Sequence, residues 1–166
     1  MNKIMFFSKE TEKIIDDTIK KGIEQVKDLI DVNLVKAIIS VESNWNPFAI
    51  RFEPELKNTR WYTNSLKNIE NITDFHFCSF GLMQVLYGVA LNLGYTGNPL
   101  GLFDPITNIH YGTSLLLNYL RIYKNIKDAI SSYNQGSPKK DKDGKYLNQA
   151  YVDKVCKAYL EYGGKL

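Results

Sequence analysis

An apolar helical segment that ends on a single carboxylate constrains this chain more than any other feature. Apolar side chains recur at the spacing of one helix face, at Leu34, Val35, Ile38, Ile39 and Val41. Asp31 stands where a residue capping the start of the helix is expected, and residues 44–47 (Asn-Trp-Asn-Pro) end it. The pattern therefore predicts a buried helix with Glu42 in its last turn.

Two interpretations of Glu42 follow from this position. Apolar neighbours remove water from the carboxyl group, and the negative end of the helix dipole faces it. Both effects raise its pKa, and a carboxyl group that keeps its proton near neutral pH can act as a general acid. The other interpretation is a solvated glutamate at a frayed helix end, which this segment taken alone favours.

Length and composition predict one packed domain and no strongly charged partner surface. The chain has 166 residues, of which 44% are hydrophobic, enough for one packed core. Its net charge of +3 is too small to indicate a nucleic-acid partner, and we expect none. The basic excess lies in the C-terminal half, which suits either an anionic polymer such as a bacterial cell wall or a solvated surface. No apolar run is long enough for a membrane span.

The N-terminal segment and the cysteines add two expectations. The apolar patch in residues 1–8 is too short for a secretory signal. We therefore expect either that a signal has been removed or that export follows another route. Cys78 and Cys156 lie far apart with no metal-ligand spacing, which favours buried free thiols and leaves a disulfide open.

The periodicity predicts a mainly α fold with minimal β structure, about six to seven helices and a substrate cleft. We expect helices at residues 9–30 (capped by Ser8), 32–43, 81–93, 105–123 (capped by Asp104, with Pro105 at its first position), 127–134 and 146–162. Residues 44–78 are irregular, with short strands at 47–53 and 60–64, and form one wall of the cleft. Residues 136–144 form a polar loop. No linker interrupts the chain, so residues 1–166 are expected to form a single domain.

Several separated motifs, taken in order, resemble the soluble lytic transglycosylase (SLT) family, which is related to goose-type lysozyme. The matching segments are Glu42-Ser43, Asn46-x-x-Ala49, Gly81-Leu82-Met83-Gln84, Phe103-Asp104-Pro105-x-x-Asn108-Ile109, Ser132-Tyr133-Asn134-Gln135-Gly136 and Tyr151-Val152-x-x-Val155. The resemblance covers residues 32–160 and leaves the first helix, residues 1–30, outside it. This ordered set reverses the interpretation of Glu42 in favour of catalysis.

The sequence departs from the family pattern in two places. A long insertion, residues 51–80, separates the first two motifs and resembles elaborated forms seen in some phage and bacterial wall-degrading enzymes. The usual Ala-Tyr-Asn-Ala-Gly is Ser-Tyr-Asn-Gln-Gly at residues 132–136. The two substituted residues lie on either side of Tyr133 and Asn134, which are kept. The substrate contacts near Gln135 are therefore not implied by the family pattern.

The resemblance implies cleavage of the β-glycosidic bond between N-acetylmuramic acid and N-acetylglucosamine in peptidoglycan. Glu42 would be the only acid and base, assisted by the acetamido group of the substrate, and an anhydromuramoyl end would form without a cofactor. A monomer acting on the cell wall, in the periplasm or outside the cell, is expected. The insertion favours a phage-encoded, endolysin-like protein over a bacterial one.

The same resemblance implies six substrate-binding residues. These are Ser43, Met83, Gln84, Tyr133, Asn134 and Tyr151. The two tyrosines and Asn134 offer hydrogen bonds to Glu42 or to the sugars, and Gln84 offers both a donor and an acceptor. Ordinary helix or core packing is the alternative, and for Met83 it is equally favoured.

Other classes of function stay open at this stage. A goose-type lysozyme hydrolase would need a second carboxylate, for which Glu53 and Glu55 are the candidates, although solvated loop charges are the more common case. An inactive glycan-binding module or phage structural component would have no need to keep the motif residues together. His76 and His110 have no acidic or cysteine partner at ligand spacing, so no metal site is expected.

Overall fold

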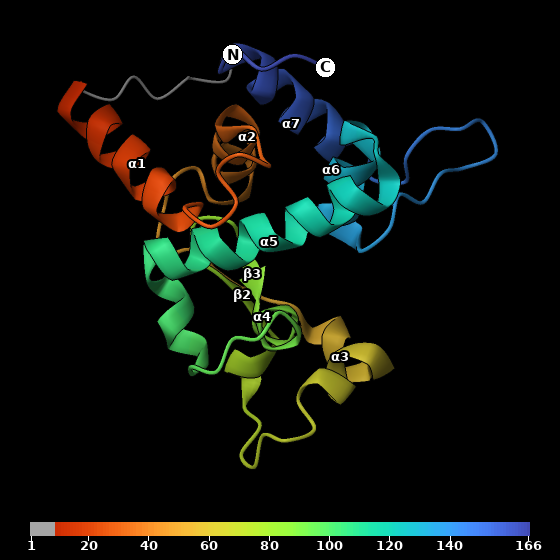
Figure 1. Ribbon diagram of the computed structural model, residues 1–166. Coiled ribbons are helices and arrows are strands. Elements are labelled where there is room, and N and C mark those ends of the chain that lie inside the picture. Colours follow the sequence, from red (N-terminus) through yellow and green to blue (C-terminus); the bar gives the residue numbers. More distant parts are fainter. Residues whose placement is uncertain (1–8) are drawn as a thin grey trace.

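The computed structural model describes residues 9–166 and confirms a mainly α fold with one small sheet (Figure 1). The helices are α1 (Lys9–Gly22), α2 (Val32–Ser43), α3 (Arg60–Ser65), α4 (Tyr87–Asn92), α5 (Pro105–Tyr123), α6 (Ile126–Gln135) and α7 (Gln149–Glu161). The strands are β1 (Ile50–Phe52), β2 (Cys78–Phe80) and β3 (Val85–Leu86). Short 3₁₀ turns are η1 (Pro54–Asn58), η2 (Asp74–Phe77) and η3 (Pro99–Phe103).

The long helix α5 organises the packing. It crosses the middle of the molecule in Figure 1 and packs against α1 and α6, while α2 packs against α7. The apolar face predicted for α2 is buried, since Leu34, Val35, Ile38 and Ile39 are at most 1% exposed. This packing holds the last turn of α2, and with it Glu42, against α7.

Both predicted helix caps at aspartates are confirmed. Asp31 accepts a hydrogen bond from the backbone N–H of Asn33 at 2.8 Å, and Asp104 accepts one from Thr107 at 2.8 Å ahead of Pro105. Asp31 also accepts a hydrogen bond from the Tyr159 hydroxyl at 2.7 Å, which ties the start of α2 to α7.

The three strands form an antiparallel sheet in the order β1-β2-β3. Arg51 pairs with Ser79 and Phe52 with Cys78. The insertion, residues 51–80, therefore leaves the sheet from β1 and returns to it through β2, which closes its base. It lies in the lower part of the molecule in Figure 1, beside α4.

The strand predicted at residues 60–64 is wrong, because this segment is helix α3. Its Tyr62 is fully buried, donates a hydrogen bond to the His76 carbonyl at 2.7 Å and accepts one from the Gly88 N–H at 3.0 Å. A Cβ on Gly88 would come within 2.9 Å of the Tyr62 ring, so glycine permits this contact. These tertiary contacts overrode the local preference of an aromatic-rich segment for a strand.

The helix predicted at residues 81–93 begins too early. Residues 81–84 form a tight turn in which Gly81 and Gln84 both have positive φ (70° and 48°). Strand β3 follows, and only Tyr87–Asn92 are helical. The helical spacing could not reveal a turn that is fixed by side chains distant in the sequence.

The first helix ends at Gly22, not at residue 30, and its proposed cap Ser8 lies outside the described residues. A Cβ on Gly22 would come within 2.5 Å of Ile109, so glycine permits the close approach of α1 to α5. Ile19, in the helix, and Ile23 and Ile30, beyond its end, are all buried. Within residues 9–166, none of the helices combines the length and apolar character needed to cross a membrane.

The two cysteines are free and buried, as predicted. At the other end of the fold, α7 starts at Gln149 although a start at Tyr146 was predicted. Tyr146 instead pairs with Lys140 in a small hairpin, and its N–H donates to the Gln149 side chain at 3.1 Å.

Candidate active site

A cleft of about 910 Å³ separates the insertion from the helices around α5, and Glu42 lies in its lining. One wall comes from α5, α6 and the loop that follows α6, including Tyr119, Tyr133, Asn134, Ser137 and Lys139. The other comes from β1, η1, α3 and α4, including Arg51, Glu53, Glu55, Trp61 and Asn92. The predicted wall formed by the irregular segment is thus present.

Glu42 has the properties expected of a general acid. Burial raises the pKa of its carboxyl group, and the negative charge of Glu53 raises it further. A hydrogen bond from Tyr151 and the positive charge of Arg51 act in the opposite direction without cancelling the effect of burial. The carboxyl group therefore keeps its proton to a higher pH than an exposed glutamate does.

Tyr151 on α7 fixes the orientation of this carboxyl group. Its hydroxyl donates to Glu42 Oε1 at 2.6 Å, a bond that joins α7 to the end of α2. Burial and the negative charge of Glu42 hold the pKa of the Tyr151 phenol well above its ordinary value. The phenol is therefore a permanent donor to Glu42.

Tyr133 approaches the same carboxyl group from α6. Its hydroxyl donates to the Met83 carbonyl at 2.8 Å, and both burial and the charge of Glu42 raise its pKa. Because its proton is donated to Met83, its oxygen can take part in further hydrogen bonds only as an acceptor. Asn134, next along α6, lines the cleft and accepts a hydrogen bond from Asn148 at 3.0 Å.

Gln84 lines the cleft, but its amide is engaged by the protein. Its nitrogen donates to the carbonyls of Ala49 (3.1 Å) and Gly81 (3.0 Å), and its oxygen accepts from the Ser79 hydroxyl (2.9 Å). These bonds hold the 81–84 turn against the sheet. In this arrangement Gln84 shapes the cleft wall through its own hydrogen bonds.

Three of the expected substrate-binding residues lie outside the cleft lining: Ser43, Met83 and Tyr151, of which Tyr151 reaches the site through its bond to Glu42. The Met83 side chain is fully buried, and a Cβ on Gly112 would come within 2.6 Å of its sulfur. The Ser43 hydroxyl donates back to the Ile39 carbonyl at 3.1 Å, as serine commonly does in helices. The Ser43 and Met83 side chains are placed for packing, and of these two residues only the Met83 carbonyl takes part in the site, through Tyr133.

Asn108, in the motif at residues 103–109, fixes the 81–84 turn beside the site. It is fully buried in α5, and its oxygen accepts from the Met83 N–H at 2.8 Å. Its nitrogen donates to the carbonyls of Phe80 (2.7 Å) and Leu102 (2.8 Å). The available signal in the sequence was its place in the Phe-Asp-Pro-x-x-Asn-Ile motif, and the structure explains it, because a buried amide needs hydrogen-bond partners.

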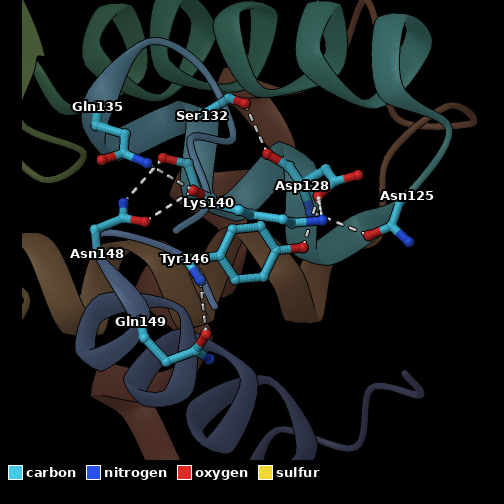
Figure 2. Close-up of polar contacts among 9 residues, drawn as sticks. Asn125, Asp128, Ser132, Gln135, Lys140, Tyr146, Asn148 and Gln149 are labelled. Carbon is cyan, nitrogen blue, oxygen red and sulfur yellow. Dashed lines mark hydrogen bonds and ion pairs between the residues drawn. The ribbon is translucent and has the colours of Figure 1, made fainter. Parts of the chain in front are cut away.

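The loop that follows α6, residues 136–148, is held by a polar clamp on Asp128 (Figure 2). Asp128 Oδ1 accepts from the Tyr146 hydroxyl at 2.6 Å and lies 3.0 Å from the Lys140 ammonium, which also lies 4.6 Å from the centre of the Tyr146 ring. Burial raises the pKa of Asp128, but the hydrogen bonds from Tyr146 and Lys140 outweigh it and the net pKa is lowered. Since the loop supplies Ser137 and Lys139 to the cleft, the clamp positions that wall.

Tyr146→Phe should lower the free energy of unfolding at neutral pH by about 1 kcal/mol, because a hydrogen bond to a charged acceptor is lost. The pKa of Asp128 is lowered in the folded state, so its contribution is present above the unfolded-state pKa and is lost as pH falls through the folded one. The difference between variant and wild type should therefore shrink in acid. Urea denaturation at several pH values measures the free energy of unfolding, with Tyr123→Phe as the control. Equal losses of stability in Tyr146→Phe and Tyr123→Phe would contradict the clamp.

The histidines take no part in the site. His76 bonds to Thr73 at the start of η2, and the His110 ring packs edge-on against Tyr111. Across residues 9–166, no three His, Cys, Asp or Glu side chains are arranged to hold a metal ion.

The sequence matches a known family model along most of its length. The model of the transglycosylase SLT domain matches residues 21–154, a range that includes Glu42, the 81–84 turn, Tyr133 and Tyr151. The chain belongs to the SLT transglycosylase family. The predicted family resemblance is thereby confirmed.

A curated relative agrees with this membership. Protein IpgF of Shigella sonnei is 30% identical over 134 residues, which cover 79% of this chain and 72% of IpgF. A comparison with solved structures found no match. Membership of the SLT family makes this a domain of the lytic transglycosylase type, whose substrate is the peptidoglycan of the cell wall.

Proposed function

We propose that this chain is a lytic transglycosylase that cleaves the bond between N-acetylmuramic acid and N-acetylglucosamine, with Glu42 as its only acid and base. The observation that carries the proposal is a carboxyl group in the cleft whose pKa is raised by burial and whose orientation is fixed by Tyr151. An acid that starts protonated and has a fixed direction is what protonation of a glycosidic oxygen requires.

The reaction would proceed in two steps. In the first, Glu42 gives its proton to the glycosidic oxygen, the bond from that oxygen to the muramoyl anomeric carbon breaks, and the acetamido oxygen of the same sugar stabilises the positive carbon. In the second, the Glu42 carboxylate takes the proton of that sugar's primary hydroxyl, whose oxygen bonds to the anomeric carbon. An anhydro sugar forms, no water is consumed, and Glu42 regains its proton.

Two features support a single catalytic carboxylate over the hydrolytic alternative. Glu53 and Glu55 both line the cleft. Glu53, however, forms an ion pair with Arg51, so its carboxylate is already engaged. Glu55 is exposed on η1, and its charge does not contribute to the raised pKa of Glu42.

Mass spectrometry of the soluble products released from purified peptidoglycan tests the proposal. Anhydromuramoyl ends are expected. Reducing muramic ends would make the protein a hydrolase and direct attention to Glu53 and Glu55. A folded protein that releases no products would overturn the proposal and favour a glycan-binding module.

Tyr151→Phe should lower kcat by roughly tenfold, because the carboxylate formed after proton transfer loses a hydrogen bond. The same bond lowers the pKa of Glu42, so its removal should raise that pKa and move the alkaline limb of the kcat/KM profile to higher pH. Tyr159→Phe is the matched control, because it removes an equivalent bond from the same helix to Asp31, away from the cleft. An unchanged limb in Tyr151→Phe would show that the bond does not tune the acid.

A further inference from the structure

The charged pair Arg51–Glu53 lies in the cleft with Glu42, and none of the family motifs includes it. Arg51 lies in β1 and Glu53 directly follows the strand, two residues further on. The Arg51 Nε–H donates to Glu53 Oε1. The backbone N–H of Glu53 donates to the Phe77 carbonyl at 2.9 Å, which fixes this end of the strand.

The exposure of the two side chains is unequal. Glu53 is 17% exposed and Arg51 is 58% exposed. A carboxylate removed this far from water needs a partner, and the Arg51 guanidinium supplies it. Glu53 in turn limits the directions that the long arginine side chain can take, so the guanidinium stays at the cleft.

We propose that Arg51, held by Glu53, is a positioning residue whose charge stabilises the ionised form that Glu42 takes between its two steps. This inference rests on the proposed function. After the first step Glu42 is a carboxylate in a partly buried place, where its charge is costly. A cation in the lining of the same cleft offsets that cost, and Glu53 limits the offset so that Glu42 is still protonated at the start.

The charges around Glu42 are consistent with these opposite effects of Arg51 and Glu53. From α7 and α6 it faces the neutral phenols Tyr151 and Tyr133. The charge of Arg51, in β1, lowers the pKa of Glu42, and the charge of Glu53, directly after β1, raises it. The other charged groups in the cleft lining are Glu55 and Lys139, and neither contributes to the shift.

The test is a pH titration of the Glu42 carboxyl group in the folded protein, monitored by NMR in selectively labelled samples. Arg51→Gln should raise the titration midpoint and Glu53→Gln should lower it, whereas Arg51→Lys, which keeps the charge, should stay near wild type. Glu55→Gln is the matched control, with an unchanged midpoint. Midpoints that stay in place, or that move in the same direction in Arg51→Gln and Glu53→Gln, would overturn the inference.

Two further measurements separate this inference from the proposed function and from a folding defect. The alkaline limb of kcat/KM should follow the NMR midpoints in both directions, which a merely structural role would not produce. If the wild-type protein cleaves peptidoglycan but the Glu42 titration midpoint does not move in the Arg51 and Glu53 variants, only the role of the Arg51–Glu53 pair is overturned. If the midpoints move but the wild-type protein does not cleave peptidoglycan, the proposed function is overturned. If Arg51→Gln does not fold, the Glu53→Gln midpoint decides the matter, because a glutamine there leaves the arginine charge unopposed.

Discussion

Glu42→Gln should lower turnover of peptidoglycan by about 10³-fold or more, because one carboxyl group supplies both proton transfers. Glutamine keeps an oxygen that can accept from Tyr151 and nearly the same volume, so the cleft should be unchanged. Release of soluble products over time measures the loss. Retention of substantial activity would contradict the assignment of Glu42.

The stability of this variant provides its own control. Burial holds the pKa of Glu42 above its unfolded-state value, so the folded state favours the protonated form. That contribution is lost as pH rises through the folded pKa, and a neutral amide does not suffer this loss. Glu42→Gln should therefore be at least as stable as the wild type at neutral pH, which separates lost chemistry from lost folding.

Asn108→Ala should lower the free energy of unfolding by about 3 kcal/mol or more, a larger effect than at any other polar residue discussed. It leaves the Met83 N–H and the carbonyls of Phe80 and Leu102 without their partner and opens a void in a fully buried place. The 81–84 turn should loosen, and turnover should fall with stability because Tyr133 bonds to the same turn.

Asn118→Ala is the matched control for this variant. It makes the same substitution in the same helix, α5, at an exposed position. Urea denaturation should show little change there. Similar free energies of unfolding for the two variants would mean that Asn108 does not fix the turn.

The sequence predicted those parts of the fold that are coded locally. The apolar face of α2, the caps at Asp31 and Asp104 and the bounds of α5 follow from spacing and capping, which depend on neighbours within one or two turns. The order of the motifs predicted that Glu42 and Tyr151 belong together, although 109 residues separate them.

The rest depends on contacts between distant segments. Residues 60–64 became a helix because Tyr62 is buried against Gly88, and the 81–84 turn exists because Asn108 and the Gln84 amide hold it. The pairing of Arg51 with Glu53 could be suspected from their spacing once β1 was expected. The place of this pair in the same cleft as Glu42 could not be predicted, because that place depends on how the insertion folds back onto the sheet.

The consumption of water by the reaction tests the central claim most directly. Purified peptidoglycan would be digested by the wild-type protein in water enriched in oxygen-18, and the new muramoyl ends would be weighed by mass spectrometry. If Glu42 acts alone as acid and base, those ends are anhydro sugars that carry no label, because the attacking oxygen is the sugar's own hydroxyl. Reducing ends that carry oxygen-18 would contradict this account and identify a hydrolase with a second group that activates water.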